Sequence, residues 1–235
     1  MKIVTPAQIR ELERRTVDSG HLPARILMER PGLCVVELLR ERFGPLHSRR
    51  VAVICGAGNN GGDGLTVARQ LLSHGSAHVS VWLVGKPAEL RGEAAASFES
   101  AVAFGVEIRP TSELNLSCSD WVIDALFGTG MKGAVVGENA RLIEQIHQSG
   151  KPVVAVEFPS GLNAETGTAL RAAVRASITV TRGLPKHGLL PYPGESFVGE
   201  LVTADIGLLS SAADSPTLSS FLTEAADIAR WSLRI

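Results

Sequence analysis

A glycine-rich turn between an apolar run and a helical pattern constrains the fold of this chain more than any other stretch. Residues 51–55, Val-Ala-Val-Ile-Cys, are apolar, and residues 56–64 contain five glycines, two adjacent asparagines and Asp63. Apolar residues then recur at helical spacing, at Leu65, Val67, Ala68, Leu71 and Leu72. This order predicts a buried strand, a tight turn and a helix N-terminus. Free amide groups and the helix dipole at such a terminus favour an anionic group such as a phosphate.

Two common nucleotide-binding motifs fit this turn poorly. Gly56-x-Gly58-x-x-Gly61 has the spacing of a Rossmann dinucleotide fingerprint, but that motif also needs an acidic residue at the end of the next strand. The next apolar run, residues 79–84, leads instead into Gly85-Lys86. A Walker A loop needs a lysine where this chain has Gly62. A turn without a ligand stays open as an alternative, although a turn alone requires neither the paired asparagines nor Asp63.

Residues 58–65, Gly-Asn-Asn-Gly-Gly-Asp-Gly-Leu, with Ala68-Arg69 after them, resemble the central motif of the YjeF N-terminal family. In that family the motif binds NADHX and NADPHX, the hydrated forms of NADH and NADPH. The resemblance covers roughly residues 5–208. It implies that Asn59, Asn60 and Asp63 hold the ligand, and that the amide groups of Gly61 and Gly62 contact its phosphates.

Composition and the order of the apolar runs predict the fold class. Hydrophobic residues make up 45% of the chain but aromatic residues only 5%, and there are 24 glycines, which suits a parallel sheet wrapped by helices. Strands alternating with helices or loops imply parallel pairing and right-handed crossovers. We therefore expect a doubly wound, mostly parallel sheet with helices on both faces, a Rossmann-like three-layer α/β fold. The expected strands are 51–55, 79–84, 106–108, 121–126, 153–156, 178–181 and 200–206.

Charge and cysteine content indicate which kinds of binding partner and which cellular compartment to expect. The formal net charge is −1 and no basic stripe stands out, so nucleic acid is not expected as a partner. No apolar run reaches membrane-spanning length and the N-terminus lacks an apolar signal core. The three cysteines, Cys34, Cys55 and Cys118, have no metal-ligand spacing and are interpreted as reduced thiols of a cytoplasmic protein.

The two ends of the chain extend the sheet domain. Thr5 and Pro6 begin a first helix that Gly20 ends, and a second begins after Pro23 and continues to Phe43, with a kink or restart expected at Pro31. The family has a Met-Glu-Asn-Ala-Gly motif here, where this chain has Met28-Glu-Arg-Pro-Gly32.

We expect one domain over residues 1–209. Residues 210–216 are small and polar, which is typical of a linker. A short helix from Phe221 to Arg230 either resembles the approach to the dehydratase domain of many family members or packs back on the domain.

An acid follows the fourth expected strand and leads into a second glycine-rich loop. Asp124 alone is compatible with a turn or helix-capping aspartate. Residues 124–130, Asp-Ala-Leu-Phe-Gly-Thr-Gly, resemble a family motif in which the acid ligates potassium and the loop covers the substrate. The resemblance therefore implies Asp124 as a metal ligand, and as substrate contacts Gly128, Thr129, Gly130, Met131, Lys132, Gly133 and Ala134.

The fifth expected strand ends in Glu157-Phe-Pro-Ser160-Gly. The family has Asp-x-Pro-Ser-Gly, with the acid against the substrate and the serine on potassium. Glu157 is one methylene longer, so its oxygens lie about 1.5 Å further out unless the backbone compensates, and a misplacement of this size can cost about a hundredfold in rate.

Residues 179–183, followed by Pro185-Lys186-His-Gly188, resemble the closing motif of the family. Lys186 either points at the phosphates or the acids of the site, or is a solvated loop lysine. The oxygen set of Asn60, Asp124 and Ser160 suits a hard cation rather than zinc. Its single negative charge suits a monovalent ion, and potassium itself is implied by the resemblance.

The resemblance implies an NAD(P)H-hydrate epimerase of nucleotide repair, which interconverts the R and S hydrates. Inversion requires a proton to be given and taken on both faces of the ring. We expect Glu157 to transfer protons, with Asp63 as the second catalytic candidate. The implied partners are a homodimer and a fused or separate dehydratase. A non-catalytic nucleotide- or protein-binding module is the main alternative. An NAD-dependent dehydrogenase is disfavoured because the ribose acid is missing.

Overall fold

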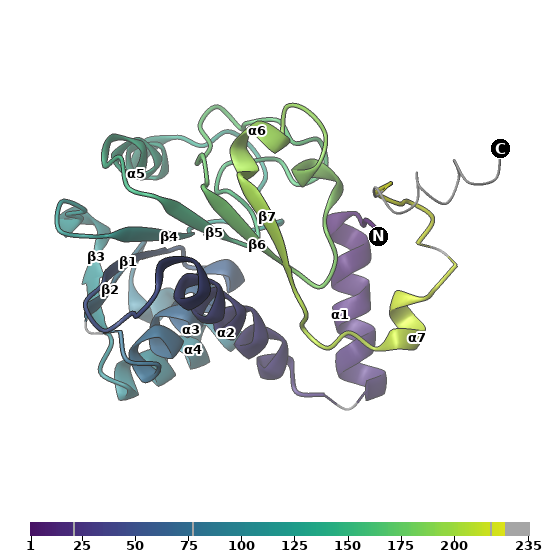
Figure 1. Cartoon of the computed structure of the whole chain (residues 1–235), viewed down its shortest axis with the longest axis horizontal. Helices are drawn as coiled ribbons and strands as arrows, with labels where there is room; N and C mark the ends of the chain where they lie inside the picture. The colour runs from purple at the N-terminus through teal and green to yellow at the C-terminus, as the bar shows by residue number, and fades with distance from the viewer. Residues whose placement is uncertain (21, 77, 217, 224–235) are drawn as a thin grey trace.

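The fold is a sheet enclosed by helices, seen in a computed structural model that describes residues 1–20, 22–76, 78–216 and 218–223. Seven parallel strands pair in the order β3-β2-β1-β4-β5-β6-β7 (Figure 1). They are β1 (Arg50–Cys55), β2 (His78–Leu83), β3 (Glu107–Pro110), β4 (Trp121–Ala125), β5 (Val153–Val156), β6 (Ile178–Arg182) and β7 (Glu200–Ala204). The predicted doubly wound α/β sheet is confirmed.

Helices cover both faces of the sheet. In Figure 1, α2 (Ala24–Phe43), α3 (Asn59–Ser73) and α4 (Gly92–Ala103) lie on one side and α5 (Gly137–Gln148) on the other. Along β1, Val51, Val53 and Cys55 belong to the core under α2, α3 and α4, whereas Ala52 and Ile54 belong to the core under α5. Both faces of the strand are buried, which is why residues 51–55 form an unbroken apolar run.

Helix α3 approaches the sheet more closely than a side chain would allow. A Cβ atom on Gly61 would lie 1.7 Å from the carbonyl oxygen of Gly56, and one on Gly64 would lie 2.5 Å from the Cβ of Ala125. These two glycines are therefore required by packing. The close approach sets the first turn of α3 directly against the ends of β1 and β4.

The N-terminal helices form where the sequence places them, with one correction. Helix α1 (Pro6–Gly20) begins with reciprocal hydrogen bonds between Thr5 and Gln8, a capping box. Helix α2 continues through Pro31 without the expected restart. Pro31 and Gly32 are buried, and Gly32 packs against Thr66 of α3, so tertiary packing outweighs the local cost of proline.

The remaining elements are short. Residues 87–103 form the 3₁₀ turn η1 (Pro87–Glu89) and then α4 rather than one helix, because Arg91 is extended and Gly92 has φ +55°. Other short elements are η2 (Thr111–Glu113), η3 (His187–Leu189), α6 (Glu195–Val198) and α7 (Ser210–Ala213). None of the described helices is long and apolar enough to span a membrane.

The C-terminal segment pairs with the first residues of the chain. Ile3 donates its amide to the carbonyl of Ser220 at 3.0 Å, and Leu222 donates to Met1 at 2.8 Å. Leu218 is buried in a small cluster with Val4, Ile9 and Leu12. The expected linker thus begins with α7, and residues 218–222 pack back on the domain. Residues 224–230 of the expected helix lie outside the described residues, and the boundary at residue 209 stays a prediction.

Candidate active site

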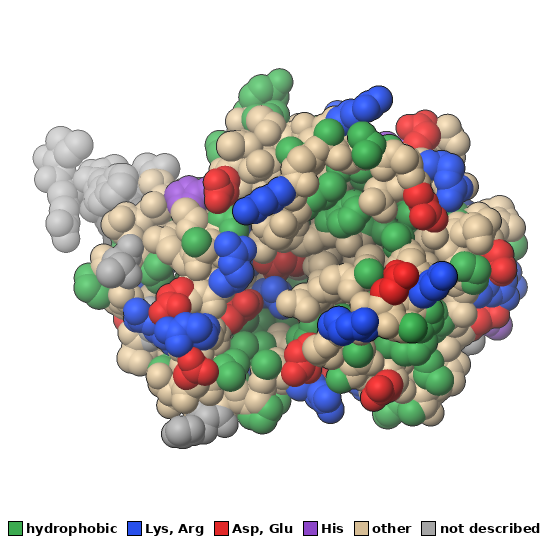
Figure 2. Space-filling model, turned by 180° about the vertical axis from the view of Figure 1, so that it is seen from behind, with side chains coloured by type: hydrophobic (Ala, Val, Ile, Leu, Met, Phe, Trp, Pro, Cys, Tyr) green, Lys and Arg blue, Asp and Glu red, His purple; other side chains and the backbone are tan. Residues whose placement is uncertain are grey.

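A pocket lies where four neighbouring strands end. Residues 56–60 after β1, residues 126–131 after β4, Glu157 after β5 and Arg182 of β6 line a cavity of about 580 Å³. Because the strands are adjacent in the order β1-β4-β5-β6, their carboxyl ends meet at one edge, next to the point where the strand order reverses. Helix α1 supplies a further wall through Arg10 and Glu13. The view from behind shows a hollow near the middle of the molecule with acidic and basic side chains in it (Figure 2).

Two buried carboxyl groups reach this pocket from different elements. Asp63 from the first turns of α3 and Glu157 after β5 are 1% and 2% exposed. Arg182 joins them: its Nη1 lies 3.3 Å from Asp63 Oδ2 and its Nε lies 3.3 Å from Glu157 Oε2. The same guanidinium has Nη2 3.6 Å from Glu13 Oε1. One cation therefore contacts three acids.

Glu157 is held in its ionised form. Lys186 Nζ lies 2.7 Å from Oε1, and the amide of Arg182 donates to Oε2 at 2.8 Å. Burial favours the neutral acid, but the charges of Lys186 and Arg182 outweigh burial and hold the pKa of Glu157 below its usual value. The residue has φ +68°, a left-handed conformation uncommon outside glycine. Glu157, which is one methylene longer than the aspartate of the family motif, therefore stands on a backbone of left-handed conformation.

Asp63 has the opposite environment. Neither of its oxygens accepts a hydrogen bond from the described chain, and Arg182 is its ion-pair partner. Burial raises the pKa of Asp63 to about 7, with Arg182 opposing the shift and Glu157 adding to it. Two carboxyl groups in one pocket thus have pKa values displaced in opposite directions, which is the arrangement expected of an acid and base pair.

A second cluster of oxygens lies beneath the pocket. The hydroxyl of Ser160 donates to Asp124 at 2.6 Å and its amide donates to the same carboxylate at 2.8 Å. Asp124 and Ser160 are fully buried, and burial raises the pKa of Asp124 to about 6 although Ser160 opposes this. Phe127 donates its amide to Ser160, and the next residue, Gly128, packs on the side chain of Asn60. Both side-chain polar atoms of Asn60 are buried without a partner among the described residues.

Comparison with protein families gives a match over residues 24–188, to the family described as YjeF-related protein N-terminus. That match covers well over half of the chain. The chain belongs to the YjeF N-terminal family.

Individual members of the YjeF N-terminal family are similar along most of the chain. The "NAD(P)H-hydrate epimerase" of Limosilactobacillus reuteri is 37% identical over 205 residues, which is 87% of this chain and 95% of the relative. The "Bifunctional NAD(P)H-hydrate repair enzyme Nnr" of Moorella thermoacetica is 41% identical over 217 residues, 88% of this chain. This chain spans only 41% of the length of that bifunctional relative. A crystal structure of the yeast protein ynu0 has the same fold, with a TM-score of 0.76 at 22% identity over 97% of this chain and 98% of that one.

Some of the residues predicted from the family motifs line the pocket. They are Asn59, Asn60, Asp63, Gly128, Thr129, Gly130, Met131 and Glu157. Lys132, Gly133 and Ala134 are exposed and lie outside the pocket lining.

Three other predicted residues serve the packing of the site. Gly61 packs on Gly56, and the amide of Gly62 donates to the carbonyl of Gly58 at 3.1 Å, so that amide is occupied within the described structure. Lys186 is fully buried against Glu157 and Thr181. The alternative of a solvated loop lysine is therefore wrong, and Lys186 points at an acid of the site.

Four polar or charged side chains of the pocket were not predicted: Arg10, Glu13, Asn139 and Arg182. A signal for Arg182 was present, because it ends a strand on the edge where the motifs gather. The first turns of α1 and α5 carry no motif that would have revealed the other three. Arg30, one of the residues that depart from the family motif, is ion-paired with Asp205 at 3.3 Å, outside the pocket lining.

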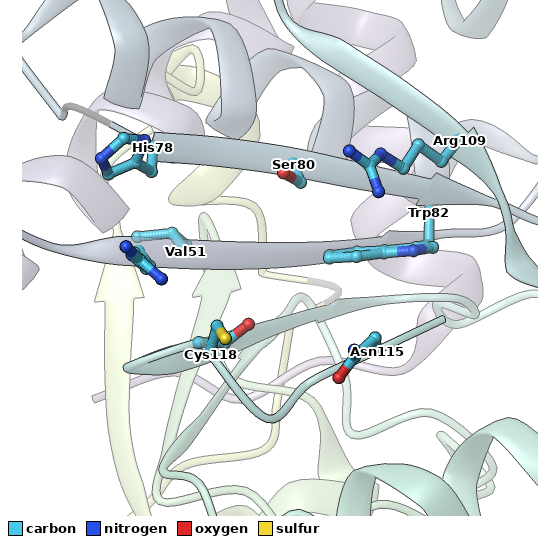
Figure 3. Close-up of a pocket in the computed structure, with 9 residues that line it drawn as sticks. Val51, His78, Ser80, Trp82, Arg109, Asn115 and Cys118 are labelled. Carbon is cyan, nitrogen blue, oxygen red and sulfur yellow. The ribbon is translucent and has the colours of Figure 1, made fainter. Parts of the chain in front are cut away.

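A smaller hollow of about 270 Å³ lies on the face of β2 (Figure 3). His78, Ser80 and Trp82 alternate along β2 and face it, with Arg109 of β3 and Asn115 and Cys118 of the following loop around them. It contains none of the predicted site residues. We therefore place the candidate active site in the larger pocket at the strand ends.

Proposed function

We propose that this protein is an NAD(P)H-hydrate epimerase, which interconverts the R and S forms of hydrated NADH and NADPH. The observation that carries the proposal is the pair of buried carboxyl groups, Asp63 and Glu157, facing one pocket beside the glycine-rich turn. The similarity to the Limosilactobacillus protein over almost its whole length supports the same activity.

The chemistry required is inversion of the carbon that bears the hydroxyl group. An acid protonates the hydroxyl, the carbon–oxygen bond breaks, and its electron pair leaves with water. The lone pair of the ring nitrogen forms a carbon–nitrogen double bond. Water then adds to the opposite face while a base removes its proton. Asp63 and Glu157 are the groups in the pocket suited to these two roles.

The dinucleotide would lie across the two glycine-rich segments. The N-terminus of α3, with Asn59 at its first position, and the loop from Gly128 to Met131 line the pocket. A helix N-terminus stabilises anionic groups, so we place the phosphates there. Arg10 on α1 adds a cation to the pocket wall.

We further propose that a potassium ion is held by Asn60, Asp124 and Ser160. Among the described residues no group of three or more His, Cys, Asp or Glu side chains is arranged to hold a metal ion. Asp124 is hydrogen-bonded to the hydroxyl of Ser160, and Asn60 contacts Gly128 in the loop whose Phe127 amide donates to that hydroxyl. The unpartnered Asn60 side chain and the single charge of Asp124 fit a monovalent ion. Bound there, it would neutralise Asp124 and order the loop that begins at Phe127.

Assembly and location belong to the same proposal. The bifunctional relative suggests that the activity works with a dehydratase, fused or separate. The resemblance to the family also implies a homodimer, and the free cysteines of the described chain are consistent with a cytoplasmic location.

The activity is tested by supplying both hydrate epimers with a dehydratase that consumes one of them. With the protein present, the other epimer should disappear at an accelerated rate. The double variant Asp63→Asn with Glu157→Gln keeps the shape of both side chains and should not accelerate it. Equal rates with and without the wild-type protein would favour the non-catalytic binding module.

A further inference from the structure

Arg182 was given no role in the sequence analysis. Its guanidinium contacts Asp63 through Nη1 and Glu157 through Nε, both at 3.3 Å. Its side chain is 17% exposed and lines the pocket together with both acids. A planar guanidinium can hold two carboxylates at once with fixed geometry.

We propose that Arg182 is a positioning residue that makes Asp63 and Glu157 share one proton, so that Asp63 begins the reaction as the acid and Glu157 as the base. This inference rests on the proposed epimerase function, and it adds the residue that limits the two acids to one proton.

The charges around the pair support the retention of one proton. Three acids meet here, Asp63 from α3, Glu157 after β5 and Glu13 from α1, against two cations, the partly buried Arg182 and the fully buried Lys186. With all three acids ionised the cluster would carry one uncompensated negative charge, which is costly where water is excluded. Arg10 on α1 also lines the pocket, but it is exposed to solvent.

Contacts decide where the proton lies. Glu157 has Lys186 at 2.7 Å and the amide of Arg182 at 2.8 Å, and both favour its ionised form. Asp63 accepts no hydrogen bond from the described chain, so its ionised form is the less stabilised. The raised pKa of Asp63 and the lowered pKa of Glu157 agree with this placement.

The proton inventory of the reaction then balances. Asp63 gives its proton to the departing hydroxyl group and becomes ionised, and Glu157 takes a proton from the incoming water and becomes neutral. The substrate returns as its other epimer, and solvent moves the proton back. The negative charge passes from Glu157 to Asp63, and Arg182 contacts both, so it stays paired throughout.

Arg182→Gln and Arg182→Lys test this role through the pH dependence of kcat/KM. Arg182 lowers the pKa of both acids, so its removal should raise both. The acidic limb, which requires ionised Glu157, and the alkaline limb, which requires protonated Asp63, should both move to higher pH by about one unit in Arg182→Gln. We expect kcat to fall about a hundredfold, the scale of lost positioning, with a smaller change in KM. Arg182→Lys should recover part of both effects.

Arg109→Gln is the matched control, because Arg109 is exposed and ion-paired only with Glu107 among the described residues. The acidic and alkaline limbs of its pH profile of kcat/KM should match those of the wild type. Limbs that stay in place in both Arg182 variants, with or without a loss of rate, would overturn the proposal.

A measurement without substrate separates this inference from the proposed function. With ¹³C-labelled carboxyl groups, NMR titration of the full chain should show Asp63 protonated at a pH where Glu157 is ionised. Both titrations should move up in Arg182→Lys or Arg182→Gln. If the wild-type protein lacks epimerase activity but these titrations behave as stated, the function is wrong and the shared proton is right. If Asp63 and Glu157 titrate together at low pH, the shared proton is wrong.

Discussion

Asp63 and Glu157 differ by one methylene group, but their surroundings shift the pKa values of the two carboxyl groups in opposite directions. Both are buried, and burial alone raises the pKa of each. Glu157 has Lys186 and Arg182 against it, whereas Asp63 has Arg182 alone among the described residues. The number of cations in contact, rather than the degree of burial, therefore decides which carboxyl group keeps a proton.

The raised pKa of Asp63 should make the free energy of unfolding depend on pH. The pKa of Asp63 is about 7 in the folded protein, against an ordinary value of 3.8. Between these values the folded state binds more protons than the unfolded state. The free energy of unfolding therefore falls as pH rises from about 4 to 7. Asp63→Asn removes that loss. Relative to the wild type, the variant should gain about 2–3 kcal/mol between pH 5 and pH 8, at about 1.4 kcal/mol per pH unit. Urea unfolding at the two pH values measures it.

The control for this measurement is Asp214→Asn, at an exposed aspartate. It should change the free energy of unfolding by the same small amount at both pH values. A difference between Asp63→Asn and the wild type that does not vary with pH would contradict the assignment.

The oxygen set around Asp124 predicts an ion-specific change in stability. At ten times its Kd, a bound ion stabilises a protein by about 1.4 kcal/mol. The thermal midpoint of the wild type should therefore rise in potassium chloride relative to choline chloride at equal ionic strength. Asp124→Asn should remove the difference, because it removes the negative ligand while keeping the shape of the side chain. Identical wild-type midpoints in the two salts would argue against the ion site.

At the scale of elements, helix α3 is positioned by its glycines. A Cβ on Gly61 would overlap the backbone of Gly56, whereas Gly58, at the N-cap of the same helix, has no atom within 4 Å of such a Cβ. Close packing thus requires glycine at position 61 but not at position 58. Gly61 allows contact between helix and strand, and Gly58 leaves room at the mouth of the pocket.

Gly61→Ala and Gly58→Ala should differ in their effect on the free energy of unfolding. Gly61→Ala should destabilise the fold by about 3 kcal/mol or more, because the backbone must move to admit the methyl group. Gly58→Ala should cost less than about 1 kcal/mol. Denaturant unfolding measures both, and similar costs for the two substitutions would show that contact between α3 and β1 does not require glycine.

At the scale of the whole molecule, residues 1–3 pair with residues 220–222 near the helix that forms one wall of the pocket. Helix α1 carries Glu13 and Arg10 to the pocket wall and packs on a small cluster that includes Leu218. This cluster is separate from the two cores that flank the sheet. The wall of the site therefore depends on a small apolar contact between residues from opposite ends of the sequence.

Leu218→Ala should loosen that wall. Leu218 is 4% exposed, and truncation of a buried leucine costs about 2–5 kcal/mol. Because the cluster is peripheral, we expect amide hydrogen exchange to increase in α1 while the strands stay protected. Phe221→Ala is the control, since Phe221 is 61% exposed and its truncation should leave exchange in α1 unchanged. Exchange that rises uniformly over the chain would show that α1 is not a separate unit.

The sequence by itself determined the positions of the seven strands along the chain, their mostly parallel pairing and the edge at which the site lies. These follow from local patterns, from the apolar run of residues 51–55 to the turn ending at Asp63, because burial on both faces and right-handed crossovers leave few other arrangements. The motif residues Asp63, Asp124, Glu157 and Ser160 were identified by resemblance to the family, and each lies at the end of a strand or in the segment that follows it.

Only the tertiary structure decided how these groups act on one another. The ion pairs of Arg182 with Asp63 and Glu13, and the α1 wall held by Leu218, join residues far apart in the chain. Lys186 is predicted by its motif but becomes a buried partner of Glu157 only because β5 and β6 are neighbours. Charge states in a buried cluster depend on which side chains the fold brings within a few ångströms, and no local pattern of residues encodes those distances.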